Sequence, residues 1–141
     1  MRALVLAAPR RPLELREVPS PEPAPGQALV EVIACAICRT DLHVLDGELD
    51  RPTLPLIPGH QVVGTIGAVG DRVTDRRVGD LVGVPWLGWA DGTCGYCTSG
   101  RENLCPDARF TGYDLDGGYA ERLVVDARFC LPVPRGFEPV A

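Results

Sequence analysis

The sequence has no lysine and no long hydrophobic run, and its net charge is negative. All fourteen basic residues are arginine, which excludes lysine Schiff-base chemistry within these 141 residues. No stretch approaches the roughly 18 consecutive apolar residues of a membrane span. The net charge of −5 argues against a nucleic acid or an anionic membrane as partner. The remaining composition, 45% hydrophobic and 6% aromatic, is typical of a globular protein.

The chain also has no clear secretion signal. The apolar residues 3–8 are soon followed by acidic ones, so we expect a strand there rather than a signal peptide. Six cysteines are present, but their spacing favours metal ligation in a reducing compartment over disulfide bonds. We therefore expect a cytoplasmic protein.

Short apolar runs separated by glycine and proline predict a mainly β domain. The runs are rich in Val, Leu and Ile and are bounded by turn residues. They lie at residues 2–7, 13–19, 27–37, 61–70, 80–86, 119–125 and 128–134. One segment, residues 38–47, predicts a short helix. Gly64, Gly67 and Gly70 do not form a phosphate-binding G-x-G-x-x-G loop, and they indicate bulges or close backbone approach within a strand.

The segment WADGTCGYCTSGRENLC, which begins at Trp89, carries Cys94, Cys97 and Cys105 at C-x₂-C-x₇-C. A closed tetrahedral zinc site needs four ligands. Asp91 stands three residues before the first of these cysteines, and an ionised Asp would preserve the charge of a four-thiolate site. Either Asp91 is the fourth ligand, or the site has decayed to free thiols with Asp91 as an ordinary turn residue.

Cys38 and His60 form a second pair of candidate ligands. Cys38 opens the predicted helix, and His60 precedes the predicted strand at 61–70. Taken singly, such a cysteine is usually a core residue and a lone histidine is usually a hydrogen-bonded loop residue. Cys35 and Cys38 also form C-x-x-C, but no thioredoxin-like βαβ pattern surrounds them, so we assign Cys35 to a buried strand position.

Taken together, these segments resemble the zinc-dependent medium-chain alcohol dehydrogenases, in particular the bacterial members akin to cinnamyl alcohol dehydrogenases. The matching strings follow the family's order and spacing over most of residues 28–134. They are ACAICRTDLHVLDGEL, LPLIPGHQVVGTIGAVG, VGDLVGVPWLG, CGYCTSGRENLC and FTGYDLDGGYAERLVV. The resemblance implies that residues 1–141 are the GroES-like catalytic domain, a distorted β-barrel with short helices and a zinc-binding loop lobe.

The resemblance implies roles for five residues at or near the Cys38–His60 pair. Cys38 and His60 would be ligands of a catalytic zinc, and Asp41 would orient His60. Thr40 would stand beside the substrate oxygen, and His43 would pass its proton to solvent. An open zinc site stabilises an alcohol oxygen as an alkoxide, and a hydroxyl followed by a histidine is a sensible proton path. The alternative is that Thr40 and Asp41 only cap the helix.

The remaining implied roles concern the cofactor, the substrate and the second zinc. Arg39 would face the pyrophosphate of NAD or NADP, and Trp86 would shape the substrate pocket; alternatively, Arg39 is a solvated charge and Trp86 a core residue. The four positions of a structural zinc would be occupied by Asp91, Cys94, Cys97 and Cys105.

Two substitutions and one absence depart from the family pattern. Asp91 replaces a cysteine, and Gln61 replaces the glutamate that usually follows the ligand histidine. Gln61 keeps the shape but loses the charge, so we expect a site about one charge more positive, with slower ligand exchange. Hydride-transfer and release rates in Gln61→Glu would test this, and unchanged rates would contradict it. The chain also ends before the Rossmann cofactor domain and the third catalytic-zinc ligand, so we expect no dehydrogenase activity from it alone.

The sequence thus predicts the catalytic domain of an enzyme that interconverts primary alcohols and aldehydes. One alternative is a zinc-free quinone-reductase relative, which the metal positions argue against. The other is a truncated, non-catalytic, zinc-stabilised β-barrel module, because a fold does not by itself give a function. We expect the full-length enzyme to be a homo-oligomer. These residues do not distinguish between alcohols or between NAD and NADP.

Overall fold

Nine strands and one α-helix occur in the part of the chain that this computed structural model describes, residues 1–49, 52–134 and 136–140. The strands are β1 (Arg2–Val5), β2 (Glu14–Glu17), β3 (Gln27–Cys35), β4 (Val62–Val69), β5 (Leu81–Val84), β6 (Leu87–Trp89), β7 (Arg109–Phe110), β8 (Arg122–Asp126) and β9 (Leu131–Pro132). The helical segments are α1 (Arg39–Asp46) and the 3₁₀ turns η1 (Cys97–Ser99), η2 (Glu102–Leu104) and η3 (Ala127–Phe129).

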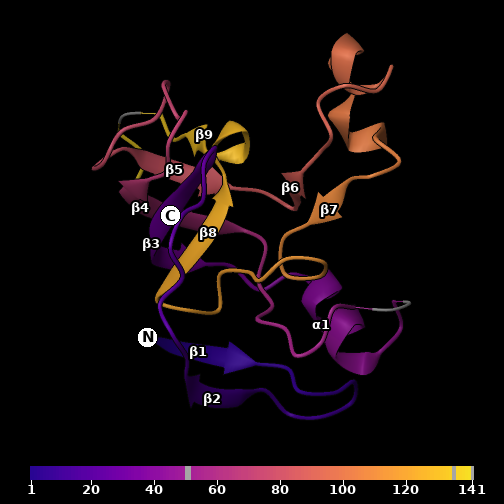
Figure 1. Ribbon diagram of the computed structural model, residues 1–141. Helices are drawn as coiled ribbons and strands as arrows, with labels where there is room; N and C mark the ends of the chain where they lie inside the picture. Colours follow the sequence, from indigo (N-terminus) through magenta and orange to yellow (C-terminus); the bar gives the residue numbers. More distant parts are fainter. Residues whose placement is uncertain (50–51, 135, 141) are drawn as a thin grey trace.

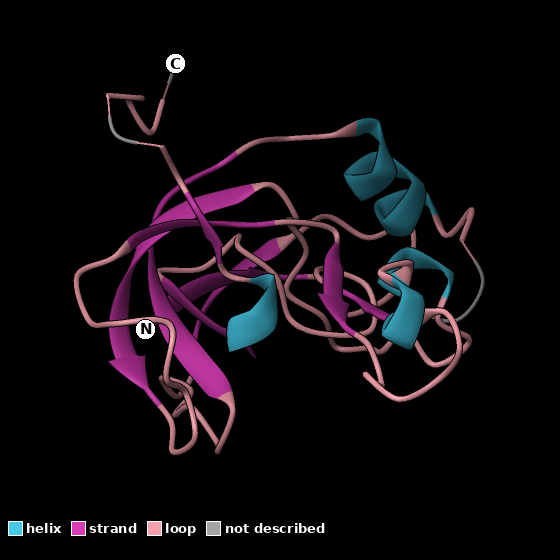
Figure 2. Ribbon diagram, turned by 90° about the horizontal axis from the view of Figure 1, so that it is seen from above, coloured by secondary structure: helices cyan, strands magenta, loops and turns pink. Residues whose placement is uncertain are grey.

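The largest sheet in the described residues is antiparallel, has the order β8-β3-β4-β5-β9 and lies on one side of the molecule (Figure 1). Alternate side chains of its strands are buried, among them Val30 on β3 and Ile66 on β4, and they make the main core. β1 and β2 form a separate pair, as do β6 and β7. Seen from above, the strands curve around one side and the helical segments lie mostly on the other (Figure 2). Among these residues no helix has the length and apolar character that crossing a membrane requires.

The predicted helix is confirmed, and its two ends have clear causes. Cys38 is the N-cap residue in extended conformation, and its N–H donates to the Asp41 carboxylate at 2.8 Å. The helix ends at Gly47, whose φ of 67° lies in the left-handed region that favours glycine. The Glu48 N–H then donates to the His43 carbonyl, which satisfies the last turn.

The predicted strands are confirmed with one partial exception. Every predicted run contains a strand, and Gly64 lies within β4, where a Cβ would stand 2.3 Å from the Glu31 carbonyl oxygen of β3. The run at 128–134 is wrong in its first half. There the Asp126 carboxylate accepts the Arg128 N–H at 3.0 Å and turns the chain into η3, so the strand is limited to β9. β6 and β7 were not predicted, because two or three residues show no periodicity.

Candidate metal centres and pocket

The segment between β6 and β7 forms a lobe that stands away from the sheet (Figure 1), and we call residues 90–108 the cysteine lobe. It contains η1 and η2, and at its base Ala90 is fully buried. A small apolar cluster of its own surrounds Ala90, including Cys97, Cys105 and the ring of Phe129. The lobe thus has only a small core, and its centre is occupied by metal-binding side chains.

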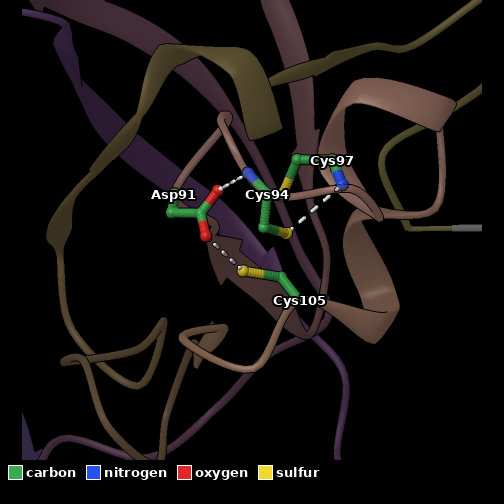
Figure 3. Close-up of side chains that lie close together, drawn as sticks. All are labelled: Asp91, Cys94, Cys97 and Cys105. Atoms are coloured by element: carbon green, nitrogen blue, oxygen red, sulfur yellow. Dashed lines mark hydrogen bonds between the residues drawn. The ribbon is translucent and has the colours of Figure 1, made fainter.

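The structure brings the four predicted side chains of the lobe together (Figure 3). One ligand atom from each of Asp91, Cys94, Cys97 and Cys105 lies within 4.8 Å of all the others. Sulfur ligands of a tetrahedral zinc, at about 2.3 Å from the metal, stand about 3.8 Å apart. The four donors therefore need only a small contraction to enclose one ion. Three thiols and one carboxylate are a donor set that zinc accepts.

The two carboxylate oxygens of Asp91 have different surroundings, one typical of a turn residue and the other suited to a ligand. Its Oδ1 accepts the N–H groups of Thr93 at 2.6 Å and Cys94 at 2.8 Å, as a turn residue does. Its Oδ2 faces the thiols and accepts from Cys105 Sγ at 3.4 Å. The Cys94 and Thr93 N–H groups hold the pKa of Asp91 well below its usual range. An ionised oxygen is thus aimed at the cluster.

The thiols lie in surroundings that suit a bound cation. The Cys97 N–H points at Cys94 Sγ, 3.5 Å away. Cys97 itself is buried, and this burial raises the pKa of its thiol. Without an ion Cys97 stays protonated, so its ionisation requires a compensating positive charge.

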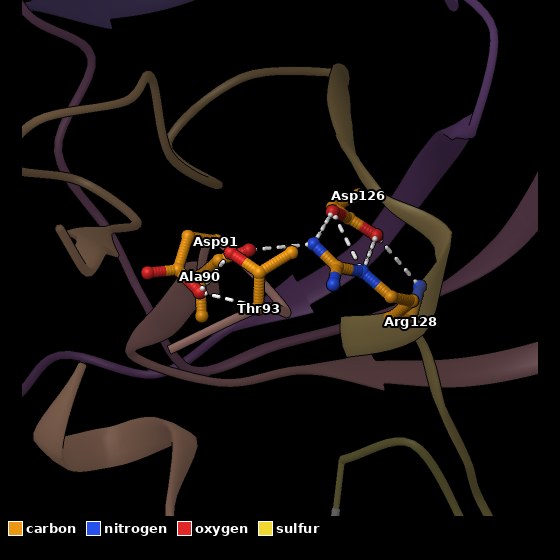
Figure 4. Close-up of polar contacts among 5 residues, drawn as sticks. All are labelled: Ala90, Asp91, Thr93, Asp126 and Arg128. Atoms are coloured by element: carbon orange, nitrogen blue, oxygen red, sulfur yellow. Dashed lines mark hydrogen bonds and ion pairs between the residues drawn. The ribbon is translucent and has the colours of Figure 1, made fainter. Parts of the chain in front are cut away.

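Arg128 is a neighbour of the lobe that sequence reasoning missed. Its guanidinium binds the Asp126 carboxylate and donates to the Ala90 carbonyl at 2.7 Å (Figure 4). A Cβ at Gly92 would stand 2.7 Å from Arg128 Nη1, so this cation packs directly on the lobe backbone. Arg128 and Ala90 are 38 positions apart, and no local pattern in the sequence reveals their contact.

The second pair of predicted ligands is placed by the pairing of β3 with β4. Cys35, at the end of β3, stands opposite Val62, at the start of β4. The Ala36 N–H donates to the Gln61 carbonyl at 2.9 Å and continues this pairing. Cys38 follows the end of one strand and His60 precedes the start of the other, so antiparallel register brings both to the same edge of the sheet. Cys35 is half-buried rather than fully buried.

Asp41 joins the segments that carry Cys38 and His60. It is 2% exposed and His60 is 4% exposed, so both are cut off from solvent. Its Oδ2 accepts the Cys38 N–H at 2.8 Å, and its Oδ1 accepts the Gly59 N–H and lies 3.2 Å from His60 Nδ1. A proton on Nδ1 satisfies this contact and leaves Nε2 as the free, ligand-competent nitrogen.

The other predicted residues of α1 are Thr40, His43 and Arg39, and only Thr40 lies next to a candidate ligand in the contacts of the described residues. Thr40 Oγ1 is 3.6 Å from Cys38 Sγ, so its hydroxyl is next to the first candidate ligand. His43 is partly exposed and its Nδ1 contacts the Glu48 carboxylate, which the sequence analysis did not include. Arg39 is exposed at the start of the helix.

A cavity of about 540 Å³ opens beside Thr40 and His60. Trp86 is one of its walls, and its ring meets the His60 ring edge-on with 4.7 Å between centroids. Phe110 stacks on the other side of Trp86 at 5.0 Å. The rest of the lining is mostly apolar. It consists of Gln61, Val62, Val63, Gly83, Val84, Pro85 and Leu131.

Two glycines, Gly59 and Gly117, allow close packing in the segment that carries His60. A Cβ at Gly59 would stand 2.6 Å from the Tyr119 ring, and a Cβ at Gly117 would stand 2.1 Å from the Gly59 carbonyl oxygen. Gly59 also has a φ of 96°. The Tyr119 hydroxyl is buried and forms no hydrogen bond within the described residues. Burial, and then the charge of Asp41, raise the pKa of this phenol.

Comparison with known proteins identifies the class to which this fold and these sites belong. The model of the alcohol dehydrogenase GroES-like domain matches residues 24–135, so the chain belongs to this family. It is the N-terminal GroES-like domain of the zinc-dependent medium-chain alcohol dehydrogenases, as its sequence predicted.

Individual relatives agree with this assignment. An alcohol dehydrogenase of Geobacillus stearothermophilus is 46% identical over 135 residues, which are 95% of this chain and 40% of that protein. A cobalt- and zinc-bound thermostable alcohol dehydrogenase from Pyrobaculum aerophilum matches with a TM-score of 0.90 at 30% identity, over 99% of this chain and 42% of that one. A cinnamyl alcohol dehydrogenase from Sorghum bicolor gives a TM-score of 0.86 at 31% identity, over 98% and 42%. The chain thus spans about 40% of the length of these relatives.

Proposed function

We propose that this chain is the catalytic domain of a zinc-dependent alcohol dehydrogenase that interconverts primary alcohols and aldehydes with NAD or NADP. The observation that carries the proposal is the buried carboxylate of Asp41, which binds the Cys38 N–H and faces His60 Nδ1. A buried charge is costly unless it serves a partner. Here it holds two candidate ligands in place and fixes the histidine tautomer that a metal requires.

Cys38 and His60 would hold the catalytic zinc, whose chemistry is to polarise the alcohol oxygen and favour loss of its proton. Thr40, next to Cys38 Sγ, would accept the proton that leaves the alcohol while its own hydroxyl proton passes on toward His43. His43 lies three residues further along α1, on the same helix face and partly exposed, so it can pass the proton to water. The Glu48 carboxylate contacts His43 Nδ1 and orients its ring.

The walls of the cavity fit the hydrocarbon part of a small alcohol or aldehyde. Trp86, Val63 and Leu131 offer apolar surface beside His60. Arg39 lies exposed at the start of α1, where it can pair with the pyrophosphate of NAD or NADP. Because the chain spans about 40% of its relatives, we assign the cofactor domain to sequence outside these residues and residues 1–141 to one catalytic domain.

The cysteine lobe would hold a second, structural zinc through Asp91, Cys94, Cys97 and Cys105. Four protein donors leave no position for substrate, which suits a structural role. Elemental analysis of the purified chain tests this site. We expect one zinc per chain in the wild type and none in Asp91→Ala; a wild type without zinc would overturn the structural site. A second zinc in the wild type would mean that Cys38 and His60 bind metal within this chain alone.

A chimera tests the dehydrogenase function. Residues 1–141 replace the matching part of the Geobacillus stearothermophilus relative, and NAD(P)H formation is measured with primary alcohols. We expect turnover that is lost in Cys38→Ser and kept in Cys35→Ser, a matched control three residues away. Thr40→Ala and His43→Ala should each lower kcat by about 10²–10⁴. A folded, zinc-containing chimera without turnover would instead favour a non-catalytic module.

A further inference from the structure

Both tryptophans of the chain lie at the stem of the cysteine lobe, and one of them is also a wall of the cavity. The stem is the β6–β7 hairpin, in which Trp89 stands opposite Arg109. Trp86 immediately precedes β6, and its carbonyl accepts the Thr111 N–H at 2.8 Å, which extends the pairing beyond the strands. One hairpin therefore carries the four-ligand cluster at one end and Trp86 at the other.

The first and last cluster residues close the outer end of this stem. Asp91 comes two residues after Trp89, where β6 ends, and Cys105 comes four residues before Arg109, where β7 begins. Asp91 Oδ2 and Cys105 Sγ are 3.4 Å apart. When both side chains bind one ion, the two strands of the stem are tied together at that end.

At the inner end, Phe110 connects the stem to the cavity. Its ring lies almost parallel to that of Trp86, at 17°, and Trp86 in turn meets His60. On the β6 side, Arg128 donates to the Ala90 carbonyl, a contact that involves none of the four candidate ligands. The strand left to respond to the ion is therefore β7, which carries Phe110.

We propose that Phe110 is a positioning residue, through which the metal in the cysteine lobe controls how Trp86 stands against His60. The inference rests on the structural zinc of the proposed function. Coupling between two sites requires an element whose arrangement both sites influence. The short β6–β7 stem is such an element, because it touches the cysteine lobe at one end and the cavity at the other. The proposal predicts that loss of the lobe metal loosens the Trp86 wall of the cavity, even though the lobe contributes no side chain to the cavity lining.

Tryptophan fluorescence can test the coupling directly. Trp89→Phe leaves Trp86 as the single tryptophan and keeps an aromatic ring opposite Arg109. Zn²⁺ is added to the chelator-treated chain, and Trp86 emission and its quenching by acrylamide are followed. We expect emission to move to shorter wavelength and quenching to fall, with saturation at one zinc per chain. Far-UV circular dichroism checks the fold of each variant, and the wild type gives the combined response of both tryptophans.

Phe110→Leu in the same background tests the residue itself. We expect this variant to bind zinc as tightly as its parent in chelator competition, while the Trp86 response to zinc is lost. Leu104→Ala, at a half-exposed apolar position of the lobe outside the stem, is the matched control and should keep the response.

The outcomes separate this inference from the proposed function. Zinc that binds at one per chain without changing Trp86 emission would overturn the coupling and leave the metal site intact. A full response in Phe110→Leu would overturn the role of Phe110. Failure of the wild type to bind any zinc would overturn both the structural zinc and the coupling that depends on it.

Discussion

The cysteine lobe and the cavity hold their candidate ligands in opposite ways. The lobe takes four donors from one stretch, residues 91–105, and places them around a point with little core of its own. The second pair takes Cys38 from one segment and His60, which lines the cavity, from another, and the β3–β4 pairing with the buried Asp41 holds them. A site built by local sequence depends on the ion for its shape, whereas a site built by the sheet is arranged before any ion arrives.

The largest effect is expected from removing a buried ligand of the lobe. Cys97→Ser should abolish zinc binding and unfold the lobe, because structural zinc sites contribute about 10 kcal/mol or more of apparent binding free energy in small domains. Hydrogen exchange should show lost protection in residues 91–105 and retained protection in β3 and β4. Cys35→Ser, outside the cluster, should keep its zinc. Simultaneous loss of protection in the sheet would show that the lobe is not an independent unit.

The next largest effect is expected at the buried carboxylate between Cys38 and His60. Asp41→Ala leaves the Cys38 and Gly59 N–H groups without their acceptor, and each unsatisfied buried group costs about 1–3 kcal/mol. We expect the free energy of unfolding in urea to fall by about 2–5 kcal/mol, and by less in Asp41→Asn, which keeps an acceptor oxygen. Asp46→Ala, on the exposed side of α1, is the control and should stay within about 0.5 kcal/mol. A loss below about 1 kcal/mol in Asp41→Ala would contradict the organising role.

A pH dependence should distinguish the carboxylate ligand of the lobe from its thiols. The Cys94 and Thr93 N–H groups lower the pKa of Asp91, so its carboxylate stays ionised at a pH at which an ordinary Asp is already protonated. Its contribution to zinc binding is lost only when the pH falls below the ordinary pKa of Asp. In weak acid, protons therefore compete with zinc only at the three thiols. The logarithm of the apparent zinc affinity should rise with pH with a slope near three, and near four in Asp91→Cys. Equal slopes would mean that Asp91 is not a ligand.

The smallest effect is expected behind His60. The Tyr119 hydroxyl is buried without a hydrogen bond in the described part of the chain, so its removal costs no partner. Tyr119→Phe should change the free energy of unfolding by less than about 1 kcal/mol or stabilise slightly, and exposed Tyr96→Phe provides the baseline. A loss above about 2 kcal/mol would show that this phenol supports Asp41 and would extend the cavity network by one residue.

The same contrast explains what the sequence could predict. The lobe ligands and the helix at 38–47 were found because their patterns are local: close cysteine spacing and an N-terminal polar turn that ends at glycine. The long strands were found from their apolar runs. The contacts of Arg128 with Ala90 and of Phe110 with Trp86 were missed, because they join segments far apart in the sequence through residues with no unusual local pattern.

The role of Asp91 shows a further limit of the sequence. Its position suggested either a ligand or a turn residue, whereas in the structure one carboxylate oxygen accepts the turn N–H groups and the other faces the thiols. Sequence patterns treat a residue as one unit and do not resolve such a division. The proximity of Cys38 and His60 was predicted only through family resemblance, because the strand register that produces it becomes visible only in the fold.

The glycine contacts behind His60 also bear on which substitutions this segment can accept. Gly117 approaches the Gly59 main chain, and Gly59 in turn approaches the Tyr119 ring, so a side chain at either glycine would collide with its neighbours. The lining of the cavity, by contrast, includes Val63, Pro85 and Leu131, whose side chains can be exchanged for larger or smaller ones. In evolution, the backbone behind His60 is therefore expected to change more slowly than the apolar lining.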